Sequence, residues 1–347
     1  MAPTTATMRA VERSIVTIDL AAIRRNAETV RRAAAEADLW AVVKADGYGH
    51  GAVDVSRAAL AGGASALCVA TLDEALPLRD AFPDVRLVVM GPVDEIAAAR
   101  EAKLELVAAD GRVPEGLPVH LKLDTGMGRW GLSELPAPTR DVVGVMSHLA
   151  TAESDQDFTR RQIERFREAT AELSGLERHI ANSAGTLRFP AARFDAVRCG
   201  IALYGISPWG RDPAADGLEP VLRWESHLAL VKRLAPGEST GYGRRFVAER
   251  HTWIGIVPVG YADGFRRDLS GTQVVVDGRT APVVGTVSMD AIAIELGREL
   301  PRGTVVTLVG KGATIEDHAR VAGTIGYEIA TGIVTSESRA RRVVRDG

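Results

Sequence analysis

Cysteine is scarce in this sequence: its 347 residues include two, Cys68 and Cys199. Two thiols so far apart cannot form the disulfide framework of a small secreted domain, and their scarcity is typical of a reducing compartment. Long apolar runs are also missing, since every run is far shorter than the roughly 20 residues that a membrane-spanning helix needs. Residues 1–14 lack the apolar core of a signal peptide. We therefore expect a cytoplasmic protein, with residues 1–13 as a flexible tail.

An excess of charge of one sign is absent as well. Lysine and arginine total 42 and aspartate and glutamate total 45, which leaves a net charge of −3. Such a balanced chain gives no electrostatic reason to expect a nucleic-acid or membrane-surface partner. Hydrophobic residues make up 46% and charged residues 25%, so bulk disorder is excluded. At about 150 residues per domain, the length predicts roughly two domains.

The first part of the chain predicts an α/β domain. Eight short apolar runs have the pattern of parallel strands that are buried on both faces. The runs are 39–44, 66–70, 86–90, 104–108, 119–124, 142–148, 178–181 and 194–198. Segments with helical periodicity separate several of them, most clearly 51–60, 72–81, 94–103 and 156–173. This alternation predicts a (β/α)8 TIM-type barrel over residues 14–223, with a doubly wound open sheet as the alternative.

The pattern changes after Arg223. Turns such as Asp277-Gly278 now separate short runs that are rich in β-branched residues. The runs are 227–234, 252–259, 273–276, 282–286, 291–295 and 304–309. One segment, 317–331, has the pattern of a helix. These features predict a mostly antiparallel, β-rich C-terminal domain over residues 224–347.

The first motif with chemical content is residues 42–51 (VVKADGYGHG). It places Lys44 at the C-terminal end of an apolar strand, where catalytic groups gather in a barrel. A lysine in a largely buried mouth has its charged form disfavoured, so its amine is available as a nucleophile. The glycines that follow let the backbone approach a ligand closely. A surface lysine beside an ordinary tight turn is the alternative, and the ten-residue context favours the functional interpretation.

This segment resembles the cofactor-lysine motif of the alanine racemases, pyridoxal-phosphate enzymes with a barrel domain and a β domain. Further matches follow in the family's order, from about residue 14 to about residue 333. They are 121–131 (LKLDTGMGRWG), 147–152 (SHLATA), 181–184 (ANSA), 198–205 (RCGIALYG), 259–264 (VGYADG), 285–290 (GTVSMD) and 324–328 (TIGYE). A single match is weak, whereas the ordered series is specific. The resemblance implies interconversion of L-alanine and D-alanine, which supplies D-alanine for peptidoglycan precursors.

The resemblance also implies a two-base mechanism. Lys44 would form the internal Schiff base with pyridoxal 5′-phosphate and then act as one base. Tyr242, in 239–243 (STGYG), would be the second base and would act in the active site of the other subunit of a homodimer. Arg198 would face the pyridine nitrogen of the cofactor. Because a guanidinium only donates hydrogen bonds, Arg198 would keep that nitrogen unprotonated and disfavour transamination.

A wider set of residues takes binding roles from the resemblance. Those implied to bind the cofactor are Lys44, Tyr48, His148, Asn182, Ser183, Arg198, Gly200, Ile201 and Tyr327. Those implied to bind or admit the substrate are Arg129, Met289, Asp290 and Tyr261. Lys122 is implied to carry a carbamate formed with CO2, whose negative charge would hold the Arg129 guanidinium. No metal site is predicted.

Taken singly, several of these residues have structural interpretations. His148 alone reads as a core histidine, and Arg198 as the partner of a barrel carboxylate. Three positions depart from the family's common pattern: Ser288 replaces a frequent cysteine, Glu153 a frequent aspartate, and 338–344 (SRARRVV) lacks the usual proline. None of these changes falls on Lys44, Tyr242 or Arg198.

Three alternative functions remain open at this point. A racemase of broader range, acting on serine for instance, uses the same site. A barrel-type pyridoxal-phosphate decarboxylase of basic amino acids usually places a carboxylate opposite the pyridine nitrogen, so Arg198 argues against that class. A non-catalytic protein that carries the cofactor or sequesters a drug is disfavoured by the presence of both proposed bases.

Overall fold

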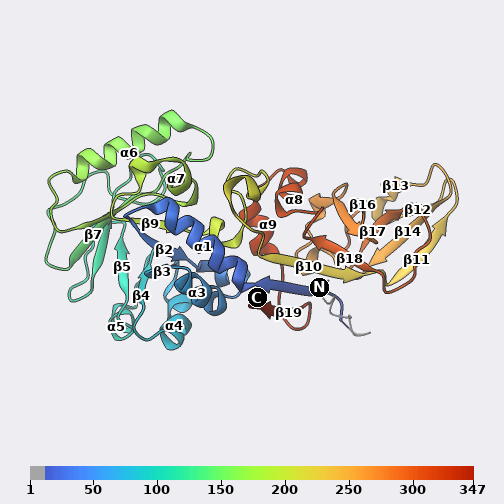
Figure 1. Ribbon diagram of the computed structural model, residues 1–347, viewed down its shortest axis with the longest axis horizontal. Helices are drawn as coiled ribbons and strands as arrows, with labels where there is room; N and C mark the ends of the chain where they lie inside the picture. Colours follow the sequence, from blue (N-terminus) through green and yellow to red (C-terminus); the bar gives the residue numbers. More distant parts are fainter. Residues whose placement is uncertain (1–11) are drawn as a thin grey trace. The chain divides into compact units, whose positions relative to one another are not determined.

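A computed structural model describes residues 12–347 of the chain (Figure 1). The described residues form two compact units. One is Leu20–Pro220, which we call the barrel unit; the other combines residues 12–19 with Val221–Gly347, and we call it the β-rich unit. The described part of the chain therefore begins in the β-rich unit, continues through the barrel unit and re-enters the β-rich unit at residue 221.

The barrel unit contains eight parallel strands that close on themselves, as the sequence predicts. In order they are β2 (Asp38–Val42), β3 (Ala66–Val69), β4 (Arg86–Val89), β5 (Glu105–Ala108), β6 (Val119–Lys122), β7 (Val142–Met146), β8 (Glu177–His179) and β9 (Ala196–Cys199). Pairing of β2 with β9 completes the ring, so the open-sheet alternative is wrong. β3 is buried along its whole length, which explains why its sequence is an uninterrupted apolar run.

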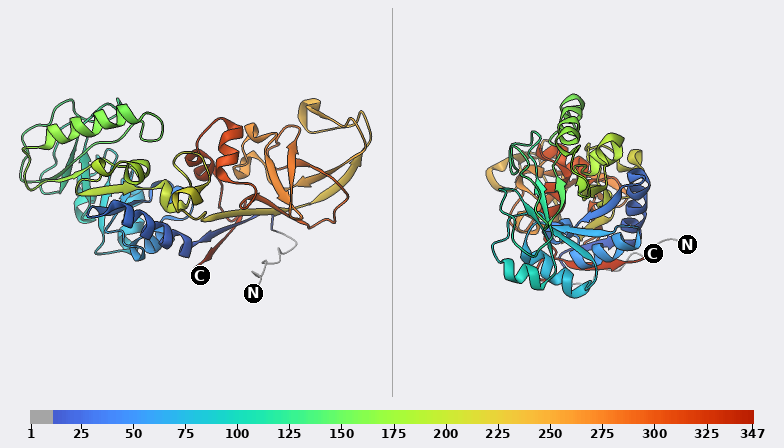
Figure 2. Two further views of the ribbon diagram at one scale, coloured as in Figure 1. Left: turned by 45° about the horizontal axis from the view of Figure 1, so that its top comes forward. Right: turned by 90° about the vertical axis from the view of Figure 1, so that its left-hand side faces the viewer.

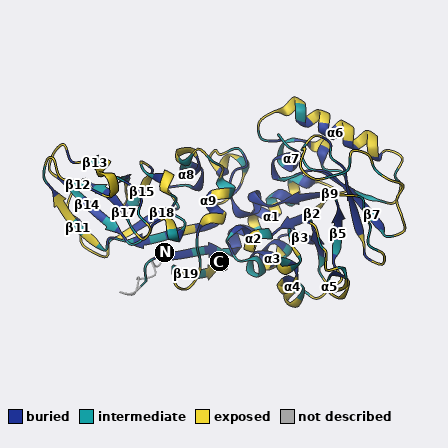
Figure 3. Ribbon diagram, turned by 180° about the vertical axis from the view of Figure 1, so that it is seen from behind, coloured by how far each residue is buried: buried dark blue, intermediate teal, exposed yellow. Residues whose placement is uncertain are grey.

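Helices lie around the outside of these strands (Figure 2). They are α1 (Leu20–Ala34), α3 (Ala52–Ala61), α4 (Leu72–Ala81), α5 (Ile96–Glu101), α6 (Gln156–Thr170) and α7 (Ser183–Arg188). The buried residues of α6 include Thr159, Ile163, Phe166 and Thr170, which recur every three or four positions and so share one face. The opposite face of α6 is exposed (Figure 3). Short 3-10 helices η1 (Pro190–Ala192), η2 (Ile201–Tyr204) and η3 (Pro213–Asp216) follow α7.

The β-rich unit is built on a nine-stranded sheet. Its strands, in spatial order, are β11 (Leu230–Leu234), β14 (Thr252–Val257), β17 (Ile292–Leu296), β16 (Arg279–Val284), β15 (Gln273–Val276), β18 (Val305–Val309), β10 (Leu222–His227), β1 (Ile15–Asp19) and β19 (Arg341–Arg345). Neighbouring strands are antiparallel except β1 and β19, which run parallel. A separate two-stranded pair consists of β12 (Ser239–Thr240) and β13 (Phe246–Val247). The prediction of a mostly antiparallel β domain is confirmed.

The structure divides the chain differently from the predicted boundaries in two places. β1 was expected in the barrel, but its backbone pairs with β10 and β19, so residues 15–19 belong to the β-rich unit. The predicted helix 317–331 is two helices, α8 (Ile315–Ala322) and α9 (Gly326–Gly332). Gly323 ends α8. Its φ of 64° is a left-handed conformation, which glycine adopts easily and which stops the helix from continuing.

The first described residues are fastened to the β-rich unit. Glu12 pairs with Arg341 at 2.9 Å, and Arg13 pairs with Asp263 at 3.3 Å. The rest of the expected flexible tail lies outside the described residues. Between residues 12 and 347, no helix is both long enough and apolar enough to cross a bilayer.

Candidate active site

The motif lysine opens a left-handed turn directly after β2. Lys44 begins α2 (Lys44–Tyr48), and φ is positive at the next four residues, between 49° and 61°. Left-handed backbone costs a residue other than glycine about 1–2 kcal/mol, so contacts around the turn must maintain it. Asp46 supplies one, because its carboxylate accepts a hydrogen bond of 2.8 Å from the amide of Ala52 at the start of α3. Lys44 thus stands where the sequence places it, at the C-terminal end of a barrel strand.

Glu74 connects this turn to the next strand. Its carboxylate accepts hydrogen bonds of 2.7 Å from the amide of Ala45 and of 2.7 Å from the amide of Ala70, which follows β3. It also forms a capping box with Thr71 at the start of α4. Sequence analysis did not single out Glu74. The signal was present, because residues 71–74 (TLDE) have the spacing of a capping box.

Five basic side chains of the barrel unit lie within electrostatic reach of one another: Lys44, Lys122, Arg129, His148 and Arg198. Burial lowers the pKa of Lys44, and the charges of Arg129 and Arg198 lower it further. The same causes lower the pKa of Lys122 to about 8. Burial and the nearby cations hold the pKa of His148 well below its ordinary value. The cluster therefore favours neutral amines and attracts anions.

Arg198 is buried and held by hydrogen bonds from both terminal nitrogens. Nη1 donates to Nδ1 and to the carbonyl oxygen of His179, at 2.7 and 2.9 Å. Nη2 donates to the carbonyl oxygen of Ser147 at 2.7 Å and to Nδ1 of His148 at 3.3 Å. A guanidinium has five N–H groups, so Nε–H is the one that meets no acceptor within residues 12–347. Burial lowers the pKa of Arg198 to about 10, which keeps it a charged donor at neutral pH.

Neutral polar groups gather around Gly200, directly after β9. The hydroxyl of Ser183 accepts hydrogen bonds from the amides of Gly200 at 3.2 Å and Ala202 at 3.4 Å. The ring of Tyr48 packs on Tyr204 with centroids 4.7 Å apart. A Cβ at Gly200 would lie 2.5 Å from the hydroxyl oxygen of Tyr48, so this close approach requires glycine. Burial raises the pKa of Tyr48, which keeps its hydroxyl protonated. Ile201 follows as the first residue of η2.

Asn182 and Gln162 hold the backbone beside these groups. Asn182 caps α7 through a hydrogen bond of 2.8 Å to its first turn, and its amide nitrogen lies 3.4 Å from Glu153. Gln162 of α6 donates to the carbonyl oxygen of His148 at 3.1 Å and accepts from the amide of Ala150 at 2.8 Å. Sequence analysis did not find Gln162. A glutamine on a helix carries no motif, and only the fold brings α6 over the end of β7.

Asp124 organises the loop that carries Arg129. Its carboxylate accepts hydrogen bonds of 2.8–3.2 Å from the amides of three successive residues, 126–128. An aspartate followed by glycines is the usual pattern of such a turn. The loop continues to Trp130, whose ring centroid lies 5.7 Å from Nζ of Lys122. The sequence matched this segment as a motif but assigned no role to Asp124.

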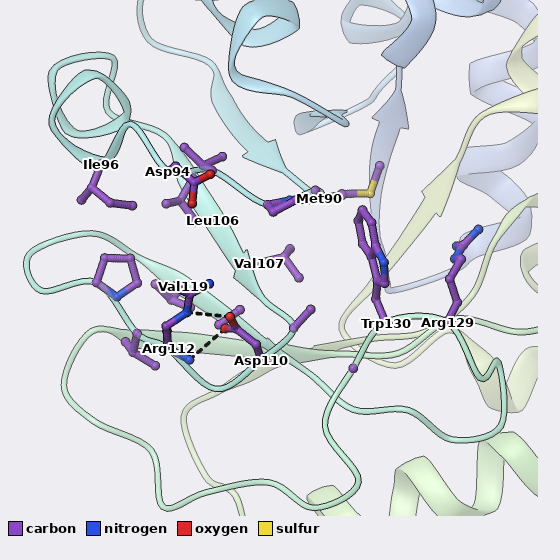
Figure 4. A pocket seen from close by; sticks show the side chains of 18 residues that line it. Met90, Asp94, Ile96, Leu106, Val107, Asp110, Arg112, Val119, Arg129 and Trp130 are labelled. Atoms are coloured by element: carbon purple, nitrogen blue, oxygen red, sulfur yellow. Dashed lines mark hydrogen bonds and ion pairs between the residues drawn. The ribbon is translucent and has the colours of Figure 1, made fainter.

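A cavity of about 640 Å³ borders the same loop (Figure 4). Much of its wall is apolar, with Met90, Leu106 and Val107 among the lining residues. Figure 4 shows Arg129 and Trp130 at one end of the cavity and the ion pair of Asp110 with Arg112, at 2.6 Å, on its wall. Among the residues with predicted roles, only Arg129 lines it.

Three predicted site residues project from the β-rich unit. Exposed fractions are 71% for Tyr242, 52% for Met289 and 42% for Tyr261. Their backbones are held by turns: the hydroxyl of Thr286 donates to the carbonyl oxygen of Tyr242 at 2.9 Å, and the amide of Tyr261 donates to that of Ser288 at 3.0 Å. The β-rich unit therefore holds the backbone of these residues in place and leaves much of each side chain exposed to solvent.

Arginines from both ends of the described chain bind Asp290. Arg339 pairs with its carboxylate at 2.6 Å and Arg13 at 3.5 Å. Both arginines also approach Asp263, whose side chain is 1% exposed. Arg339 belongs to the C-terminal stretch that departs from the family pattern, and it nevertheless contacts a predicted site residue. Tyr327 is the second residue of α9 and is half-buried.

The predicted site residues therefore fall into two sets, one in each unit. Residues from the barrel unit form the basic cluster and the polar group around Gly200, both near the C-terminal ends of the strands. They are Lys44, Tyr48, Lys122, Arg129, His148, Asn182, Ser183, Arg198, Gly200 and Ile201. The β-rich unit holds Tyr242, Tyr261, Met289, Asp290 and Tyr327.

Comparison with known proteins gives matches over nearly the whole chain. The family model for the alanine racemase N-terminal domain matches residues 18–208, and that for the C-terminal domain matches residues 221–344. The alanine racemase of Streptomyces coelicolor is 42% identical, with 93% of this chain and 94% of that protein covered. The alanine racemase of Lactiplantibacillus plantarum is 40% identical, with 92% and 94% covered.

Solved structures agree. The alanine racemase structure from Streptomyces coelicolor has a TM-score of 0.89 at 40% identity, covering 97% of this chain and 99% of that chain. The alanine racemase from Bartonella henselae, solved with covalently bound pyridoxal phosphate, has a TM-score of 0.86 at 28% identity and covers 96% and 99%.

Proposed function

The chain belongs to the alanine racemase family, and on this premise we propose that it interconverts L-alanine and D-alanine with pyridoxal 5′-phosphate (PLP) as cofactor. This activity would supply D-alanine for peptidoglycan precursors. The observation that carries the proposal is the basic cluster at the barrel mouth. There the amine of Lys44 has a lowered pKa and lies within electrostatic reach of Arg198. The Nε–H of Arg198 makes no hydrogen bond within residues 12–347.

The residues present fit PLP. Lys44 offers the primary amine that would hold the aldehyde carbon, and Arg198 offers Nε–H to an acceptor such as a pyridine nitrogen. Tyr48, Ser183 and the backbone at Gly200 and Ile201 would hold the phosphate, because this region combines hydroxyl groups with a close approach that a Cβ would block. His148, bonded to Arg198, would lie along the ring, with Asn182 and Tyr327 completing the site.

When bound, PLP draws electrons away from the α-carbon of an attached amino acid and so acidifies the α-proton. The amine of Lys44 is prepared to take that proton on one face, because its lowered pKa increases the neutral fraction. The hydroxyl of Tyr242 would serve the other face. Arg198 would donate a hydrogen bond without giving up its proton, which limits how far negative charge spreads away from the α-carbon. Return of a proton to that carbon is the outcome that racemisation requires.

Substrate recognition would fall to groups that surround the carboxylate. Arg129 supplies a guanidinium, and Met289 a backbone amide, with Asp290 and Tyr261 at the entrance. Lys122 would carry a carbamate: the ammonium first gives up one proton, and the neutral amine then adds to CO2 and loses a second, so that a cation beside Arg129 becomes an anion. Burial supports this modification, since the lowered pKa of Lys122 leaves much of the amine neutral near pH 8.

We propose a homodimer in which Tyr242 acts in the partner's active site. The exposure of Tyr242, Met289 and Tyr261 supports this arrangement, since a phenol that acts as a base needs a surrounding pocket that the β-rich unit does not supply. We also propose a cytoplasmic location, which the two free cysteines support.

The test is an absorbance spectrum of the purified protein with PLP and a racemisation assay on L-alanine, L-serine and L-lysine. We expect a visible band, removed by borohydride, and the highest kcat/KM for alanine. Lys44→Ala should lose the band and at least about 10⁴-fold in turnover. Equal rates on serine would assign a broader racemase, and CO2 release from a basic amino acid would assign a decarboxylase. A Lys44→Ala protein with full turnover would overturn the role of Lys44.

A further inference from the structure

The interior of the barrel unit contains a continuous chain of histidine and charged side chains. A barrel of this kind is ordinarily filled by branched apolar side chains. The members are Arg198 on β9, His179 and Glu177 on β8, His120 on β6, Glu105 on β5 and Arg86 on β4. The ring of Trp40, on β2, contacts the rings of His120 and His179 with centroids 5.6 and 4.5 Å apart. Since β2 and β6 lie on opposite sides of the closed ring, this contact places both histidines inside it.

Each link in the chain is a hydrogen bond of ordinary length, between 2.7 and 3.0 Å. Arg198 Nη1 lies 2.7 Å from Nδ1 of His179, and Nε2 of His179 lies 3.0 Å from Nδ1 of His120. Nε2 of His120 lies 2.9 Å from the carboxylate of Glu105. Arg86 then binds Glu105 through two hydrogen bonds of 2.7 Å. Both histidines are fully buried, so these partners replace the water that the rings lose on folding.

The chain crosses the barrel from one end to the other. Arg86, Glu105 and Glu177 are the first residues of their strands, and the strands are parallel, so the three lie at the N-terminal end. Arg198 lies in the C-terminal half of β9, at the end where the predicted site gathers. Arg86 also binds Glu177, at 2.6 and 3.1 Å. Two arginines and two glutamates therefore balance in charge, which reduces the cost of burying Arg198.

Arg198 at one end of the series and Glu105 at the other determine which ring nitrogen of each histidine carries its proton. Arg198 can only donate, so Nδ1 of His179 accepts, and the proton of that ring is on Nε2. Nε2 of His179 then donates to Nδ1 of His120, which leaves the proton of His120 on Nε2. This proton points at Glu105, and an ionised carboxylate can only accept. Burial and the charge of Arg198 hold the pKa of His179 well below its ordinary value, so the ring stays neutral as the assignment requires.

We propose that His179, His120 and Glu105 are positioning residues that keep Arg198 oriented so that Nε–H remains aimed into the cofactor site. The inference rests on the proposed function, because it concerns the group that would face the pyridine nitrogen. The chain occupies Nη1 from inside the barrel, and Ser147 with His148 occupies Nη2. A rotation of the guanidinium would break several of these bonds together and leave the acceptors that face Arg198 without a donor.

The first test measures the ring protons directly. Histidine labelled with ¹⁵N is incorporated into the PLP-loaded enzyme, and the spectra of His120→Gln and His179→Gln identify the two buried rings. We expect each ring to carry its proton on Nε2, and the ring of His179 to stay neutral from pH 6 to pH 9. A His179 ring that titrates in this range, or a proton on Nδ1 of either ring, would overturn the proposal. This readout does not depend on turnover, so it separates the inference from the proposed function, which fails if the wild type does not racemise alanine.

The second test breaks the chain while the ring packing is retained. His120→Phe keeps an aromatic ring beside Trp40 but can neither accept from His179 nor donate to Glu105. His120→Gln keeps one acceptor and one donor. We expect the apparent dissociation constant of PLP, read from the visible band during dialysis of the holoenzyme, to rise about tenfold in the phenylalanine variant and less than about twofold in the glutamine variant.

Glu177→Gln is the matched control, because it removes a carboxylate from the same arginine without touching His120. Its PLP affinity should stay within about twofold of the wild type, because the hydrogen bonds from Arg198 through His179 and His120 to Glu105 remain. Equal losses of PLP affinity in His120→Phe and His120→Gln, or in His120→Phe and Glu177→Gln, would assign the chain a general structural role and end the proposal. So would a phenylalanine variant with unchanged affinity. If that variant does not fold, the nitrogen spectra of the wild type still decide the outcome.

Discussion

The two units prepare their site residues in opposite ways. In the barrel unit the side chains bond to one another: Arg198 contacts His148 and His179, and Glu74 holds the turn that carries Lys44. In the β-rich unit the backbone is held and the side chain is left uncovered, most clearly at Tyr242, which is 71% exposed. A buried network can shift proton affinities, because burial disfavours charge and nearby charges act strongly at low dielectric. An exposed side chain depends on whatever surface comes to cover it.

The substitution Tyr242→Phe tests the exposed side of this comparison and has the largest expected effect. Removal of the hydroxyl takes away one proposed base, so we expect turnover to fall about 10²–10⁴-fold. Thermal stability should change little, by about 0.5 kcal/mol at most, because the hydroxyl makes no buried contact within the β-rich unit. Racemisation in deuterated water checks the assignment: the α-proton of one enantiomer should still exchange through Lys44 while conversion nearly stops.

Tyr261→Phe is the control for that experiment, as the other exposed tyrosine of the predicted entrance. It should retain most of the turnover. If the two variants lose activity equally, or if Tyr242→Phe still converts both enantiomers at the wild-type rate, the phenol of Tyr242 is not a base.

Gly144→Ala tests how tightly the barrel interior is built. Gly144 on β7 is the register partner of His120, and a Cβ there would lie 2.2 Å from Nδ1 of that ring. We expect a loss of unfolding free energy near 3 kcal/mol, the upper end of what overpacking usually costs, and altered nitrogen signals from His120 and His179. Gly297→Ala is the comparison, because a Cβ there meets nothing within 4 Å. Equal melting temperatures of the two variants would show that the interior yields more easily than the geometry indicates.

Lys122→Met tests how the buried ammonium group of Lys122 affects the free energy of unfolding. The measurement is made in CO2-free buffer, so that no carbamate forms. The folded-state pKa of Lys122 is about 8 against an ordinary 10.5, so the folded protein disfavours the ammonium form. The resulting destabilisation is full below pH 8 and is relieved as the pH rises toward 10.5. We expect Lys122→Met to be more stable than the wild type at pH 7 by about 1–2 kcal/mol, with the difference vanishing above pH 10.

Added bicarbonate completes that experiment. It should stabilise the wild type but not Lys122→Met, because only the lysine can form the carbamate that would hold Arg129. In the assay, Lys122→Ala should lose activity and regain part of it with small carboxylate anions. Unchanged activity in Lys122→Ala, without any response to anions, would contradict the carbamate.

The smallest expected effect concerns the ion pair at Asp290. Arg339→Gln removes the arginine that lies 2.6 Å from this carboxylate, and we expect KM for alanine to rise about two- to fivefold with kcat nearly unchanged. Arg341→Gln is the control, since Arg341 belongs to the same terminal stretch but pairs with Glu12. Identical KM values for the two variants would mean that Arg339 does not support Asp290.

Local patterns explain which parts of the fold and the site could be predicted. Eight mostly apolar runs predicted the barrel strands, because strands that are buried on both faces seldom show a regular alternation of polar and apolar residues. Lys44 was placed correctly because a strand end and a glycine-rich turn are adjacent in sequence. The same rule misplaced β1: residues 15–19 read as the start of an α/β pattern, and only pairing with β10 and β19 assigns them to the other unit.

By itself, then, the sequence determined the strand series, the ordered motifs and the residue types on which the proposed site depends. The tertiary structure decided which of those residues constrain one another. His120 and His179 are 59 positions apart and Arg13 and Asp263 are 250 apart, and no local pattern encodes either pair. Such contacts exist only once the barrel closes and the sheet assembles, because hydrogen bonds and burial depend on distance in space rather than on separation along the chain.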